Sequence, residues 1–124
     1  AYNEEALLGE MLDRLNRCIK EISNFKGEII VVDNNSNDRT SEIAKAKGAK
    51  VIFEPINQIS KARNAGACQA SGNYLFFIDA DTFISQSMIL ACICKIQAAR
   101  FNKSFIKSRR QSLFLEIKKK SSFR

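Results

Sequence analysis

The 124-residue sequence contains no histidine. Serine and cysteine nucleophiles that depend on a histidine base are therefore excluded. The cysteines are scattered without a C-x-x-C pair, so we expect no structural zinc site and predict reduced thiols of a cytosolic protein. Their positions are Cys18, Cys68, Cys92 and Cys94. Any chemistry must use carboxylates, lysine, tyrosine, amides or a metal ion.

Long apolar runs and glycine-rich phosphate loops are also missing. No run approaches the roughly 18 apolar residues that span a bilayer, and no signal peptide precedes the first motif, which predicts a cytoplasmic protein. Neither G-x-G-x-x-G nor G-x-x-x-x-G-K-[ST] occurs. A bound phosphate would therefore need a metal and basic side chains. Lys61 and Arg63 are candidates, with a solvated helix face as the alternative.

Basic residues are scarce before residue 100 and abundant after it. Residues 1–99 carry 11 basic and 12 acidic side chains, whereas residues 100–124 carry nine basic side chains and only Glu116 as an acid. This change in charge divides the chain into a domain over 1–99 and a basic tail over 100–124 of unassigned structure. Such a tail can bind phosphates, nucleic acid or anionic lipid, or be a solvated terminus. We expect no specific nucleic-acid partner, and consider peripheral contact with the inner face of the cell membrane.

Helical and extended patterns alternate along the first domain. Apolar residues at helical spacing predict the helices, and β-branched runs bounded by Gly, Pro and Asn predict the strands. Helices are expected at 4–23, 39–47, 60–70 and 85–100, and strands at 28–33, 51–53 and 74–78. The order predicts an α/β fold with a parallel sheet and right-handed crossovers. Gly48 is expected to end the second helix, because glycine readily adopts positive φ.

Carboxylates follow two of the predicted strands. Asp33 ends one strand, and Asp79 and Asp81 follow the continuous apolar run 74–78, which we expect to be buried on both faces. In an extended chain, side chains two residues apart point to the same side, roughly 6 to 7 Å apart. Ligands bind at the carboxyl ends of parallel strands, and a divalent cation would relieve the repulsion between the acids. The alternative is a solvated turn that caps the next helix.

Four segments together resemble the signature blocks of family 2 glycosyltransferases with the GT-A fold. They are residues 1–5, 29–40, 57–66 and 79–81, in the family's order and spacing. The resemblance covers about residues 1 to 85. It implies a GT-A, Rossmann-like, mostly parallel sheet flanked by helices.

The resemblance also implies an activity and a nucleotide pocket. The activity is inverting transfer from a nucleotide-diphosphate sugar with Mg²⁺ or Mn²⁺. In the family, the positions of Ala1 and Tyr2 lie against the base, Glu4 lies near it, the acid matching Asp33 binds it, and the arginine matching Arg63 lines the pocket.

The Asp-x-Asp pair has separate roles in the family. Asp79 would lie near the ribose, and Asp81 would hold the metal on the diphosphate. The acceptor, a polysaccharide, a lipid or a protein glycan, is not specified by these residues. A nucleotide-binding module or nucleotidyltransferase with a similar α/β layout is the alternative function.

Two features depart from the family pattern. The family's first strand, in the middle of the sheet, precedes the block that begins here at Ala1, so we expect its two neighbours to have unpaired edges. The family's catalytic base follows the Asp-x-Asp motif, where this chain offers only Glu116. We therefore expect a donor-binding half truncated at both ends, with no assigned catalytic residue and a dispensable tail.

Overall fold

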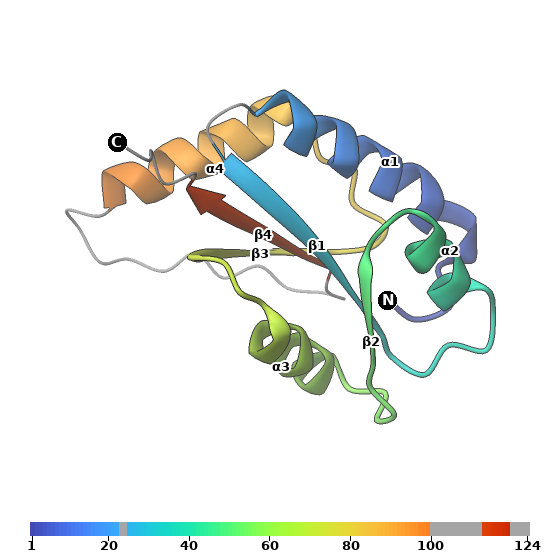
Figure 1. Cartoon of the computed structure of the whole chain (residues 1–124). Coiled ribbons are helices and arrows are strands. Elements are labelled where there is room, and N and C mark those ends of the chain that lie inside the picture. The colour runs from blue at the N-terminus through green and yellow to red at the C-terminus, as the bar shows by residue number, and fades with distance from the viewer. Residues whose placement is uncertain (23–24, 100–112, 120–124) are drawn as a thin grey trace.

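The computed structural model describes residues 1–22, 25–99 and 113–119 and has an α/β fold (Figure 1). Its elements are α1 (Glu5–Glu21), β1 (Phe25–Asp33), α2 (Thr40–Ala46), β2 (Lys50–Phe53), α3 (Ile59–Gln69), β3 (Tyr74–Ile78), α4 (Gln86–Ala99) and β4 (Leu113–Lys119). The seven predicted elements are confirmed, and their ends differ from the predicted ones by at most three residues. Positions 23 and 100, the predicted ends of the first and last helices, lie outside the described residues. The eighth element, β4, was not predicted.

The strands form one mixed sheet in the order β2-β1-β4-β3. β1 pairs in parallel with β2, and β4 pairs antiparallel with both β1 and β3. The three predicted strands, β1, β2 and β3, therefore run in the same direction, as expected, and β4 adds an antiparallel strand that was not predicted. The prediction of unpaired edges in the middle of the sheet is wrong, because part of the predicted basic tail pairs with both neighbours there.

Helices cover the two faces of the sheet unequally (Figure 1). The larger core packs α1 and α4 against one face, with Leu12 and Leu15 of α1 and Ile29 and Val31 of β1 almost fully buried. The smaller core packs Ala62 of α3 against Ile30 and Val32 on the other face. Since successive strand residues alternate between faces, β1 is an unbroken apolar run because both faces are covered.

β3 differs from β1 in this respect. Phe76 and Ile78 face the larger core, but Leu75 and Phe77 are 36% and 42% exposed. The expectation of a strand buried on both faces is wrong here, because α3 packs mainly against β1, and within the described part of the chain the same face of β3 stays partly exposed. β3 is also the last strand of the sheet. An apolar run alone does not distinguish these two situations.

Two glycines fix local geometry. Gly48 follows α2 with φ of 77°, and its N–H bonds to the Lys45 carbonyl at 3.0 Å, which confirms it as the helix stop. Gly27 lies in β1 where α1 approaches closely, and a Cβ atom there would lie 2.8 Å from Ile19 Cγ2. Among the described residues, no helix combines the length and apolar character that crossing a membrane requires.

Candidate functional site

The carboxyl ends of β1 and β3 lie at the same edge of the sheet. Val31 of β1 and Ile78 of β3 both pair with Leu113 of β4, so the two strands are level where they end. Asp33 is two residues beyond Val31, and Asp79 is one residue beyond Ile78. The sheet therefore brings the acids predicted from the sequence to one edge.

The first residue of the chain lies beside the end of β1. The Ala1 nitrogen donates to the Val32 carbonyl at 2.6 Å, and the Asn34 N–H donates to the Ala1 carbonyl at 2.8 Å. This is the hydrogen-bond pattern of a parallel bridge opposite Asp33. Ala1 and Asp33, two of the predicted site residues, are thus adjacent.

The two polypeptide segments continue to interleave past this bridge. The Asn3 N–H donates to Ser36 Oγ at 3.0 Å, and the Asn37 N–H donates to Asn3 Oδ1 at 2.9 Å. Asn3 and Asn35 have φ of 51° and 63°, a left-handed conformation that asparagine tolerates better than most residues. Asparagine at these two positions is therefore suited to the local turns.

Asp33 is a buried carboxylate, 6% exposed. Its Oδ1 accepts the Ser36 N–H at 3.0 Å, which stabilises the loop that follows β1.

Arg63 and Asp79 are brought together from α3 and the end of β3. Arg63 Nη2 lies 4.0 Å from Asp79 Oδ1, and both side chains are mostly buried. The guanidinium also lies over the Phe77 ring, 5.8 Å from its centroid. The cationic end of Arg63 is thus held at the same edge as the acids. Lys61, the other basic candidate, is exposed on α3.

Asp79 and Asp81 occupy a turn. The Thr82 N–H donates to the Asp79 carbonyl at 3.0 Å, so the two acids are the first and third residues of a β-turn. The argument that an extended chain points both to the same side is therefore wrong, because β3 ends at Ile78. Asp81 is exposed and Asp79 half-buried.

Glu4 and Asp81 are electrostatically coupled. Burial raises the pKa of the Glu4 carboxyl above its ordinary value, and the charge of Asp81 raises it further. Within residues 1–22, 25–99 and 113–119, no three His, Cys, Asp or Glu side chains form a group that could hold a metal by themselves. A cation at this edge would need ligands from a substrate or from water.

Other features lie outside this edge. An open depression between α1 and the start of α4 is lined by none of the predicted site residues; its lining is Arg14, Arg17, Cys18, Glu21, Ile84 and Ser85.

All four cysteines are free, and burial raises the pKa of the Cys18 thiol. Tyr2 is half-buried between Ala1 and Asn3.

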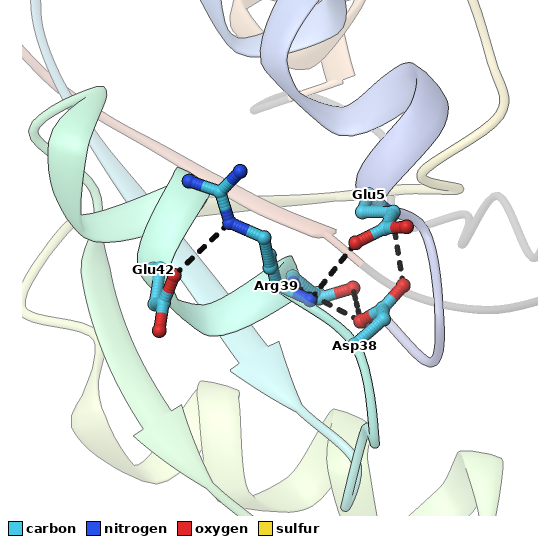
Figure 2. Close-up of polar contacts among 5 residues, drawn as sticks. Glu5, Asp38, Arg39 and Glu42 are labelled. Carbon is cyan, nitrogen blue, oxygen red and sulfur yellow. Dashed lines mark hydrogen bonds and ion pairs between the residues drawn. The ribbon is translucent and has the colours of Figure 1, made fainter.

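Sequence reasoning missed the residues that join the amino-terminal segment to the β1–α2 loop. Glu5, Asp38 and Thr40 take part in hydrogen bonds between the starts of α1 and α2. Figure 2 shows those of Glu5 and Asp38. The signal was present in part, since Asp and Thr directly before a helix are typical caps. The pattern does not reveal that Asp38 caps a helix other than its own.

Residues 1–117 match the family model described as glycosyl transferase family 2. The chain is 36% identical over 95 residues to an uncharacterized glycosyltransferase of Haemophilus influenzae, a match that covers 71% of this chain and 36% of that protein. It is 35% identical over 92 residues to the uncharacterized glycosyltransferase EpsJ of Bacillus subtilis, covering 70% and 26%. It is 33% identical over 105 residues to 4,4'-diaponeurosporenoate glycosyltransferase of Staphylococcus haemolyticus, covering 79% and 27%.

The chain thus spans about a quarter to a third of the length of these relatives. No solved structure matches it.

Proposed function

Because the chain belongs to glycosyl transferase family 2 and is by family a transferase, we propose that it binds a nucleotide-diphosphate sugar at the carboxyl edge of β1 and β3. Glycosyl transfer requires a sugar donor and an acceptor. In this proposal the donor is a sugar nucleotide, the transfer inverts the anomeric centre, and Mg²⁺ or Mn²⁺ takes part. The observation that carries the proposal is the convergence of Ala1, Asp33, Arg63 and Asp79 at one edge.

The base and ribose are assigned to the β1 side of this edge. Asp33 accepts hydrogen bonds through Oδ2, since Oδ1 is engaged with Ser36. Ala1 and Tyr2 supply the adjacent surface, because Ala1 is bonded to both neighbours of Asp33. Asp79 accepts from the ribose, and the Arg63 guanidinium lies 4.0 Å from its Oδ1.

The donor atoms at this edge fit a hard divalent cation. Carboxylate oxygens are the ligands that Mg²⁺ and Mn²⁺ prefer, and such sites often use one or two carboxylates with substrate phosphates and water. Asp81 is the exposed acid that would hold the ion, and the coupling between Asp81 and Glu4 is the repulsion that a cation would relieve. When bound, the ion would neutralise the departing nucleotide diphosphate as a Lewis acid.

A binding titration tests this proposal. UDP, GDP and CTP are titrated into the wild-type chain and Asp81→Asn, each with and without Mn²⁺, with Glu21→Gln at the exposed end of α1 as the control. We expect Mn²⁺-dependent binding of a diphosphate to the wild type and to Glu21→Gln. Asp81→Asn should lose about 10-fold or more in affinity with Mn²⁺, because it removes a charged ligand.

Two results would count against parts of the proposal. Equal affinity with and without Mn²⁺ in both Asp81 forms would remove the metal assignment. Tighter binding of CTP than of either diphosphate would favour a nucleotidyltransferase.

A further inference from the structure

The amino-terminal ends of α1 and α2 cap each other. A helix N-terminus has backbone N–H groups without partners inside the helix and a partial positive charge. In α1 the cap residue, Glu4, makes no side-chain hydrogen bond to its own helix. Its own N–H donates instead to Thr40 Oγ1 at 2.9 Å. The Glu5 N–H donates to Asp38 Oδ2 at 3.1 Å (Figure 2).

The start of α2 also donates a hydrogen bond to a side chain of α1. The Arg39 N–H, at the start of α2, donates to Glu5 Oε2 at 3.1 Å. Asp38 Oδ1 accepts from the Thr40 N–H at 3.0 Å and from its hydroxyl at 2.5 Å. We call Glu5, Asp38 and Thr40 the reciprocal cap. Each helix end supplies a carboxylate to the other, more than 30 residues away in sequence.

The reciprocal cap is the last of three sets of hydrogen bonds that join the amino-terminal segment to the loop after β1, beside the proposed nucleotide site. In the first set, Ala1 is bonded to the backbone on both sides of Asp33. In the second, Asn3 is bonded to Ser36 and Asn37. The reciprocal cap is the third. The segment with Ala1 and Tyr2 and the loop with Asp33 are thereby held as one unit.

We propose that Asp38 is a positioning residue for the nucleotide site: through Thr40 and the start of α1, it fixes the amino-terminal segment against the loop that carries Asp33. This inference rests on the proposed function. Asp38 acts without touching the ligand, through the placement of Ala1, Tyr2 and Asp33. Glu42 pairs with the exposed Arg39 side chain and, among the described residues, makes no contact to the amino-terminal segment, so it has no such role.

Asp38 suits this role because its ionised form is favoured. Burial works to raise the pKa of the Asp38 carboxyl, but hydrogen bonds from the Thr40 hydroxyl, the Thr40 N–H and the Glu5 N–H together outweigh it and lower the pKa. Charged caps make stronger hydrogen bonds to backbone N–H groups than neutral ones. The link is therefore strong at neutral pH.

The first test needs no ligand. Backbone hydrogen exchange is measured at Asn3, Glu5 and Ser36 in the wild type, Asp38→Ala and the control Glu42→Gln. We expect exchange about 10-fold faster at these three positions in Asp38→Ala, with protection in β1 unchanged, and no change in Glu42→Gln. Unchanged exchange at Asn3 and Ser36 in Asp38→Ala would overturn the proposal.

The second test is a double-mutant cycle on nucleotide affinity, with UDP and GDP as probes in the presence of Mn²⁺. Asp38→Ala should weaken binding by about 3-fold to 30-fold in the wild-type background, and by less than about 2-fold when Asp33→Ala is already present. The same loss in both backgrounds would overturn the positioning role. If the wild type bound neither nucleotide, the proposed function would be overturned, and the exchange test would still decide whether Asp38 joins the two segments.

A milder pair of variants guards against misfolding of Asp38→Ala. Thr40→Val removes the hydroxyl at nearly constant volume, and Thr40→Ser keeps it. We expect Thr40→Val to repeat the loss of affinity and Thr40→Ser to restore it. Equal affinity in the two variants would contradict a role that depends on the hydroxyl link from Asp38 to the Glu4 N–H.

Discussion

Single side chains at the carboxyl edge of the sheet have structural roles beside the ligand-binding roles that we propose for them. Asp33 uses one oxygen to stabilise its own loop, and in the proposed site it would offer the other to a ligand. Arg63 is shared between Asp79 and the Phe77 ring. Since each of these groups also supports the local fold, substitutions here should affect stability and binding together. Variants at this edge therefore need stability measurements beside affinity measurements.

Asp38 allows a pH test at the residue scale. The folded chain holds its pKa below the ordinary 3.8, so ionised Asp38 stabilises the fold above that pH, and this contribution is lost as the pH falls through the lowered value. Asp38→Ala should cost about 0.5 to 2 kcal/mol at pH 7, the range for a cap residue replaced by alanine. Urea unfolding should show this difference shrink below pH 3.8, whereas a constant difference down to pH 2 would contradict the assignment.

At the element scale, the fit between α1 and β1 depends on Gly27. A Cβ atom there would lie 2.8 to 2.9 Å from three atoms of Ile19, which is branched at Cβ and cannot easily move aside. Gly27→Ala should therefore cost about 1 to 3 kcal/mol by overpacking. Chemical denaturation of the purified variant measures this loss.

Gly9 supplies a matched control for that substitution. It lies inside α1, and an added Cβ would meet Ile43 Cγ2 at 3.5 Å, an ordinary contact. Alanine favours a helix interior over glycine by about 1 kcal/mol, so Gly9→Ala should stabilise the protein. If the two substitutions changed stability equally, the close approach of α1 to β1 at Gly27 would not determine the effect of the added Cβ atom.

The elements that the sequence predicts well are those with local signals. The end of β1 at Asp33, the stop at Gly48 and the amphipathic stripe of α1 depend on residues close in sequence. The turn after Ile78 was missed because apolar residues predict a strand but not where its extended conformation ends. The partner of Asp38 was missed because a cap to another helix depends on the packing of α1 against α2.

At the scale of the whole molecule, β4 determines the sheet. Residues 113–119 were predicted as part of a basic tail because Lys118 and Lys119 dominate the local charge. Nothing local indicates that this segment pairs with β1 on one side and β3 on the other. Pairing between segments more than 30 residues apart is decided by which edges the rest of the fold leaves available, and charge patterning carries no such information.

A proline in β4 tests this arrangement. Leu115 lies opposite Ile29 of β1 and Phe76 of β3. Leu115→Pro removes an N–H from a strand with neighbours on both sides, and each backbone group left unpaired costs about 1 to 3 kcal/mol. We expect a loss of about 2 to 4 kcal/mol in urea unfolding, and association of the variant through the exposed edges of β1 and β3 in light scattering. Leu115→Val, which keeps the backbone N–H, is the control and should lose much less stability and not associate. If the two variants unfold at the same urea concentration, β4 does not stabilise the sheet, and the prediction of a dispensable tail over 100–124 is favoured instead.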